Sequence, residues 1–109
     1  MVGHYSASKS AMRSLTETAA LEWAGHGITV NAYSPGLVHT DMWDALDREI
    51  VALEGGTPGD VIAGAVSDIP LGRLEHPDDV AGLVSYLASP DAAYLTGRSV
   101  VVDGGMLLG

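Results

Sequence analysis

The feature of this sequence that most constrains its fold is a pair of short strand patterns separated by helical patterns. Residues 28–34 alternate apolar and polar side chains and are ended by Pro35 and Gly36. Residues 99–103 contain the continuous apolar run VVV, which is typical of a strand covered on both faces. Because helical patterns separate the two strands, we expect them to pair in parallel in a doubly wound α/β sheet.

Two long helices are expected beside these strands. The first should cover residues 5–24 and stop at Gly25 and Gly27. The second should cover residues 77–89, with acidic residues in its first turn. Each helix carries an apolar stripe at helical spacing, formed in the first by Met12, Leu15, Ala19 and Trp23 and in the second by Val80, Leu83, Val84 and Leu87.

The segment between the first strand and the second helix, residues 41–70, is polar, acidic and interrupted by glycine and proline. It contains two short helical patterns, and Thr57, Pro58 and Asp60 resemble an N-terminal cap of the second. The apolar face of the first pattern is formed by Met42, Leu46, Ile50 and Leu53. A segment of this length is often a lid over a site, and on composition a surface excursion that merely packs is an equal alternative.

Two short parallel strands do not make a stable sheet by themselves, because their open edges need neighbours. The apolar content of 47% fits faces that other parts of a fold cover. We therefore expect the chain to be the second half of a larger α/β domain, with faces that further strands or partner subunits cover.

The charge balance of this chain argues against several classes of partner. Five basic and fourteen acidic side chains give a net charge of -9, whereas nucleic acid and acidic membrane surfaces attract basic proteins. There is no cysteine, and no apolar run reaches the roughly 18 residues of a membrane span. The histidines are too scattered to suggest a metal site. We expect a cytoplasmic protein with no nucleic-acid partner, no membrane partner and no metal.

Tyr5 and Lys9 form the first candidate site. Residues four apart lie on the same face of a helix, so the phenol and the lysine stem should point the same way. An ammonium group and a helix N-terminus both favour the phenolate form, which suits a phenol to acid/base work. By itself such a pair is more often a packed ring beside a solvated amine.

Four stretches of the chain resemble the short-chain dehydrogenase/reductase family in order and in spacing. They are YSASK at 5–9, ITVNAYSPGLVHT at 28–40, PLGRLEHPDDVAGLVSYLAS at 70–89 and YLTGRSVVVDGG at 94–105. The YxxxK pattern alone is weak, but the four together are specific. The resemblance covers essentially the whole chain and implies the C-terminal half of a Rossmann-type sheet with three α/β/α layers.

The resemblance implies an oxidoreductase that moves a hydride between NAD or NADP and an alcohol or ketone carbon. Tyr5 would be the acid/base, and Lys9 would stabilise its phenolate and bind the nicotinamide ribose. The remaining cofactor contacts would lie at the end of the first strand and just after it, at Pro35, Gly36, the backbone of Val38 and the hydroxyl of Thr40. Taken alone, Pro35 and Gly36 indicate a plain turn and Thr40 a helix cap.

Several parts of the family pattern precede the YxxxK motif and are not present in these residues. They are the glycine-rich pyrophosphate loop, the residue that selects NAD or NADP, and the catalytic serine. Since Met1 stands four residues before Tyr5, we expect a truncated reading frame, a fragment or one piece of a split enzyme. Without those parts, the isolated chain should neither bind dinucleotide appreciably nor turn over.

Within the family, GLVHTDMWDALDRE and VDGGMLLG look most like acetoin or diacetyl reductases, also called butanediol dehydrogenases. Met42 and Trp43 would then border an apolar pocket over a small ketone or diol, or they would simply pack on the core. A polyol dehydrogenase and a 3-oxoacyl reductase are alternatives within the family. A further alternative, of a different class, is a non-catalytic chain that acts through subunit interfaces. The family implies a homodimer or homotetramer assembled through Ser6–Ala24 and Pro77–Gly109.

Overall fold

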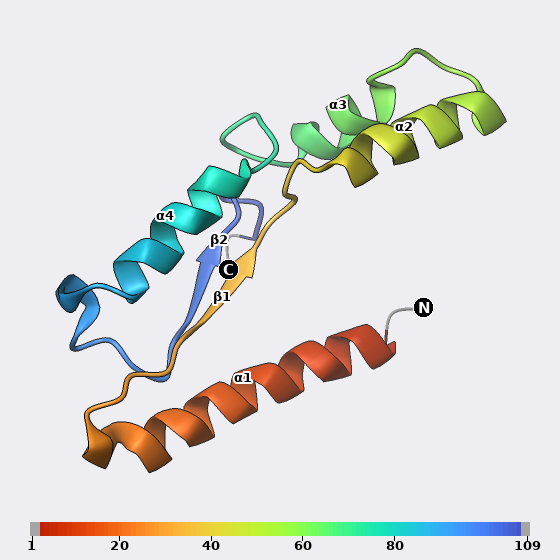
Figure 1. Ribbon diagram of the computed structural model, residues 1–109. Coiled ribbons are helices and arrows are strands. Elements are labelled where there is room, and N and C mark those ends of the chain that lie inside the picture. The colour runs from red at the N-terminus through yellow and green to blue at the C-terminus, as the bar shows by residue number, and fades with distance from the viewer. Residues whose placement is uncertain (1–2, 108–109) are drawn as a thin grey trace. The chain divides into compact units, whose positions relative to one another are not determined.

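The computed structural model describes residues 3–107. Its elements follow one another as shown in Figure 1. In chain order they are α1 (Gly3–Trp23), η1 (Ala24–His26), β1 (Ala32–Pro35), α2 (Asp41–Glu54), α3 (Asp60–Ser67), α4 (Pro77–Leu87), η2 (Pro90–Ala92) and β2 (Ser99–Val102). Strands β1 and β2 are neighbours in a two-stranded parallel sheet, which confirms the α/β class.

The chain divides into two compact units, and the division crosses both strands. The first unit contains the residues up to Ser34 together with Gly82–Val101. The second contains Pro35–Ala81 together with the residues from Val102 onward. Each unit is described here by itself.

In the first unit, helical and strand residues form layers. The second half of α4 and α1 lie on opposite sides of the strands (Figure 1). Val84, Leu87 and Ala88 border a hollow together with Thr29, Asn31 and Tyr33. On α1, Ala20 is buried at 4% exposure and lies beside Gly97, where an added Cβ would stand 3.4 Å from the Ala20 Cβ. The apolar pattern of α1 therefore places a small residue where the turn before β2 approaches.

Strand β1 is shorter than the predicted strand over residues 28–34, so that boundary was wrong. Val30 donates its N–H to the Thr96 hydroxyl at 3.0 Å, and the Asn31 amide binds Leu95 O at 2.8 Å and Arg98 N at 3.2 Å. These residues are thus held to the turn before β2 partly by side-chain hydrogen bonds, from the Thr96 hydroxyl and from the Asn31 side chain itself. Regular strand geometry begins at Ala32, whose N–H donates to Arg98 O at 2.8 Å.

The end of α1 follows from its glycines. Gly27 has φ +72°, a left-handed conformation that a residue without Cβ adopts at no steric cost, and its N–H donates to Ala24 O at 3.0 Å. Gly25 lies inside the short η1 turn. Of the two predicted stops, Gly27 is the one that ends the helical path.

The predicted apolar stripes are only partly covered by the described residues. Met12 and Leu15 on α1 are 57% and 67% exposed, and Val84 on α4 is 41% exposed. In β2, Val101 is 52% exposed while its neighbours Val100 and Val102 are half-buried, so this strand is not covered on both faces. Alternate strand residues point to opposite faces, and the described residues leave the Val101 face largely open.

In the second unit, α2 and α3 pack against each other and form most of residues 41–70, for which a lid role stays a prediction. The apolar side chains of α2 are mostly exposed, with Met42 at 67% and Leu53 at 78%, whereas Asp47 is buried at 5%. The carboxylate of Asp47 accepts hydrogen bonds from Gly59 N at 2.7 Å and Val61 N at 3.1 Å. It therefore caps α3 from the neighbouring helix.

The predicted cap of α3 was wrong in its details. The N-cap residue is Gly59, so Pro58 lies outside the first turn. In a Thr57 cap, the Thr57 side chain would accept an N–H of the helix. Instead, the Asp60 carboxylate accepts the backbone N–H of Thr57 at 2.7 Å. A cap supplied from 12 residues away left no signal in the local pattern.

The second unit also holds the loop that precedes α4. Ile69 and Leu74, exposed at 5% and 8%, are buried in it, and an isolated parallel bridge pairs Val38 with Glu75. Among residues 3–107, no helix combines the length and the apolar character needed to cross a membrane.

Candidate functional site

Tyr5 and Lys9 lie in the first two turns of α1. The Lys9 Nζ stands 5.3 Å from the centroid of the Tyr5 ring, which is within the range of a cation–π contact. The two side chains therefore share one face of the helix, as four-residue spacing predicts. The ammonium lies over the ring face, and Tyr5 is 57% exposed.

The turn at Pro35 and Gly36 follows directly from the end of β1. The N–H of Gly36 donates to Val102 O at 2.8 Å and to Glu75 Oε2 at 2.9 Å. A Cβ at Gly36 would stand 2.8 Å from the Cα of Asp103. Glycine is thus required here because the backbones of two segments meet too closely for a side chain.

Residues 37–40 follow this turn. To bind a nicotinamide carboxamide, they must offer polar groups that have no hydrogen-bond partner among the described residues. Main-chain hydrogen bonds join Leu37 O and His39 N to Glu75, and no hydrogen bond to a described residue engages the N–H or C=O of Val38. Thr40 is the N-cap residue of α2, yet its hydroxyl makes no capping bond. A carboxamide carries one carbonyl acceptor and two N–H donors, so it needs a donor and acceptors opposite it, and this segment offers groups of both kinds.

Met42 and Trp43 begin α2, in the same unit as the turn. Met42 is 67% exposed and Trp43 is half-buried. The backbone N–H of Trp43 donates to Thr40 O at 2.9 Å. Tyr5 and Lys9 belong to the first unit, and the other six predicted site residues belong to the second. Those six are Pro35, Gly36, Val38, Thr40, Met42 and Trp43.

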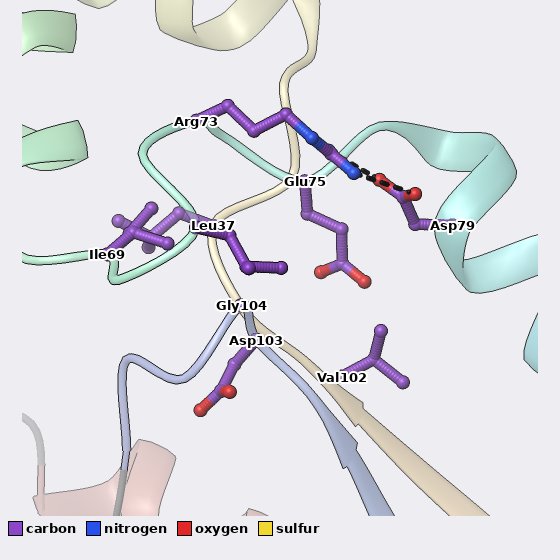
Figure 2. Close-up of a pocket in the computed structure, with 9 residues that line it drawn as sticks. Leu37, Ile69, Arg73, Glu75, Asp79, Val102, Asp103 and Gly104 are labelled. Atoms are coloured by element: carbon purple, nitrogen blue, oxygen red, sulfur yellow. Dashed lines mark hydrogen bonds and ion pairs between the residues drawn. The ribbon is translucent and has the colours of Figure 1, made fainter.

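Sequence reasoning missed Glu75, which lies beside the turn. Glu75 is 7% exposed and borders a cavity of about 100 Å³. Burial raises the pKa of Glu75, and the Gly36 N–H partly offsets that effect. Figure 2 shows the side chain directed from its loop toward Val102. The cavity is lined by Leu37, Ile69, Leu71, Arg73, Glu75, Asp79, Val102, Asp103 and Gly104.

Arg73 and Asp79 form an ion pair on one side of this cavity (Figure 2), with N–O distances of 2.7 and 3.0 Å. The hydrogen bond from Arg73 lowers the pKa of Asp79 to about 2. Asp79 also accepts the N–H of His76 at 2.8 Å, the residue just before α4. The pair thus ties the loop to the first turn of α4. The acidic residues after Pro77 indicate a cap of α4 in the sequence. No sequence pattern indicates the pairing of Asp79 with Arg73.

Residues 1–107 match a family model described as enoyl-(acyl carrier protein) reductase, one of the models of the short-chain dehydrogenases/reductases. The chain belongs to the short-chain dehydrogenase/reductase family. The match spans all four predicted motifs and confirms the resemblance on which they were grouped.

Members of this family with known activities are similar to the chain along nearly its whole length. A diacetyl reductase [(S)-acetoin forming] of Staphylococcus epidermidis is 51% identical over 98% of this chain and 42% of its own length. An L-2,3-butanediol dehydrogenase of Corynebacterium glutamicum is 50% identical over 94% of the chain and 40% of its own length. The chain thus spans about two fifths of the length of these relatives.

A solved structure of a family member shares the fold. L-sorbose reductase from Gluconobacter frateurii, complexed with NADPH and L-sorbose, superposes with a TM-score of 0.90 at 30% identity. The superposition covers 96% of this chain and 40% of that one. This agreement confirms the Rossmann-type α/β class.

Proposed function

We propose that this chain carries the proton-transfer residues and part of the nicotinamide site of an NAD(P)-dependent oxidoreductase. The observation that supports this most directly is the Tyr5–Lys9 pair on one face of α1, within a chain of this family. The nicotinamide, when bound, gives or accepts the hydride. Tyr5 gives its hydroxyl proton to the carbonyl oxygen during reduction and takes the proton back during alcohol oxidation.

Lys9 has two roles in this proposal. Its positive charge stabilises the phenolate that remains after Tyr5 has given up its proton, and its N–H groups bind the ribose hydroxyls. The free backbone groups of Val38 and the Thr40 hydroxyl hold the carboxamide, next to the Pro35–Gly36 turn. Either NAD or NADP serves as coenzyme in this proposal.

The proposed substrate is a small ketone or secondary alcohol, namely diacetyl, acetoin or 2,3-butanediol. Its support is the two relatives at about 50% identity that are named for these compounds. Met42 and Trp43 would contribute apolar surface over such a substrate. A polyol or ketose is the second candidate, because the L-sorbose reductase structure superposes so closely.

The alternative from another functional class is a non-catalytic chain that acts only through its subunit interfaces. The exposed apolar residues of α1, among them Met12 and Leu15, support assembly as a homodimer or homotetramer. The cytoplasmic location expected from the sequence also stays a prediction.

Complementation tests the proposed function. The chain would be mixed with a separately purified N-terminal half of the Staphylococcus epidermidis diacetyl reductase, and oxidation of NADH and NADPH would be followed with diacetyl, acetoin and L-sorbose. Turnover of diacetyl or acetoin that requires both parts supports the proposal, and preference for L-sorbose supports the second candidate. Formation of a mixed complex without turnover of any of these substrates would favour the interface role.

A further inference from the structure

Glu75 holds the segment that follows β1 through its own main chain. Its N–H donates to Leu37 O at 2.9 Å, and its carbonyl accepts the N–H of His39 at 2.7 Å. These two bonds flank Val38 and leave the polar groups of Val38 free. They involve backbone atoms alone, so they do not depend on which side chain position 75 carries.

The side chain of Glu75 reaches the same segment at a second point. Its Oε2 accepts the N–H of Gly36 at 2.9 Å, but Gly36 shares that N–H with Val102 O at 2.8 Å. The Gly36 N–H would therefore keep a partner if Glu75 were absent. The other oxygen, Oε1, is buried and has no hydrogen-bond partner among the described residues.

A carboxylate in this position is costly for the stability of the fold. A buried acceptor without a partner forfeits its hydration, and a buried charge forfeits more. The charges around the group add to this cost, because Asp79 on α4 and Asp103 after β2 both disfavour the ionised form. Arg73 favours the ionised form weakly, since its guanidinium is committed to Asp79.

An apolar residue would pack here without that cost, and a glutamine would avoid the cost of the buried charge. Departures from the rule that buried polar groups are satisfied are concentrated at functional sites. The cavity of about 100 Å³ beside the carboxyl also gives it room to change its hydrogen bonding (Figure 2).

We propose that Glu75 is a positioning residue whose carboxyl group sets the position of the Gly36 amide, and with it the backbone from Gly36 to Thr40, according to its protonation state. The ionised carboxyl makes a charge-assisted bond that competes with Val102 O for the Gly36 N–H. The protonated carboxyl makes a weaker bond and leaves the N–H to Val102 O. The functional meaning rests on the proposed function, because that backbone is the proposed carboxamide contact.

The test is an amide titration by NMR on the ¹⁵N-labelled 109-residue chain. We expect the Gly36 amide shift to move with pH, with a midpoint above the ordinary 4.5 of glutamate because burial raises the pKa of Glu75. The movement should be lost in E75Q, whose amide oxygen accepts the Gly36 N–H at every pH. The matched control is E54Q, which removes an exposed charge in the same unit. In this control the Gly36 amide shift should move with pH as it does in the unchanged chain.

A Gly36 amide that does not move with pH would overturn the proposal. So would a movement that persists in E75Q, since it would come from Asp79, Asp103, His39 or His76. If E75Q does not fold, D103N decides the question. Removing that negative charge should lower the midpoint, and an unchanged midpoint would overturn the proposal. No coenzyme enters this measurement, so its failure is separate from failure of the complementation experiment.

Discussion

Tyr5 and Lys9 are the residues on which the proposed chemistry depends. Their pairing needs nothing beyond four-residue spacing on α1, and the Nζ-to-ring distance of 5.3 Å reflects that spacing. By contrast, the Gly36 turn depends on residues 39 and 66 positions away, Glu75 and Val102. The two groups of residues are therefore very different in how far local sequence specifies them.

Replacing the Tyr5 hydroxyl tests the proton-transfer role directly. In the complemented enzyme, Tyr5→Phe should lower kcat by about 10²- to 10⁴-fold, because the carbonyl oxygen loses its positioned proton donor. Steady-state oxidation of NADH with diacetyl measures the effect. Tyr86→Phe, which removes the hydroxyl of another half-exposed helical tyrosine, should leave kcat unchanged. Full activity in Tyr5→Phe would rule out Tyr5 as the acid/base.

Helices α3 and α4 receive their N-terminal caps in different ways. Asp79 caps α4 from within its first turn, by accepting the N–H of His76, and this is a local arrangement. Asp47 caps α3 from α2, by accepting two N–H groups at the start of the helix. Capping from another element joins α2 and α3 into one body.

Loss of the Asp47 carboxylate should loosen α3. Asp47→Ala leaves the N–H groups of Gly59 and Val61 without this acceptor, at a cost of about 1–3 kcal/mol in the free energy of unfolding. Urea titration followed by circular dichroism measures the cost. Glu49→Ala, on the exposed side of the same helix, should change it by about 0.5 kcal/mol or less. Equal stability of the two variants would show that the cap contributes nothing.

The Arg73–Asp79 pair predicts a loss of stability in acid. The pKa of Asp79 is lowered from 3.8 to about 2, so between these values the folded chain binds fewer protons than the unfolded chain. The contribution of Asp79 should be complete above pH 4 and decline as the pH falls toward 2. Urea titrations at several pH values should show this decline, and Asp79→Asn should remove it. Asp78→Asn, whose side chain is 91% exposed, should retain the decline.

At the scale of the whole chain, the exposed apolar surface is the main feature. Large apolar side chains on α1, on α2 and in β2 are more than half exposed, as at Leu15, Met42 and Val101. Side chains exposed in this way are typical of surfaces that other strands or subunits cover. In the proposed enzyme, these surfaces would meet other strands or a partner subunit.

The chain without an added N-terminal half should not function as an enzyme. We expect no NADH binding by fluorescence titration and no reduction of diacetyl, because the glycine-rich pyrophosphate loop expected of the family is not among these 109 residues. Binding should appear when the N-terminal half of the diacetyl reductase is added. Reduction of any ketone by the chain alone would contradict this prediction.

The sequence by itself determined which segments are helices and strands, and to which family the chain belongs. Periodicity placed α1 and α4 within two residues of their bounds and two short helical patterns within residues 41–70, because helix formation depends on local spacing and on stop signals such as Gly27. Four motifs in order were enough for the family, since their combined spacing is rarely met by chance.

Tertiary structure decided what those elements bury and which carboxylates lie inside. The cap of α3, the Glu75–Gly36 hydrogen bond and the shortened β1 all depend on contacts between residues 12 to 67 positions apart. Local patterns carry no information on such contacts, because acidic residues like Asp47 and Glu75 look the same in a sequence whether they are solvated or buried. Two backbone N–H groups offset the cost of removing the Asp47 carboxylate from water, whereas Glu75 accepts a single shared N–H and keeps part of that cost.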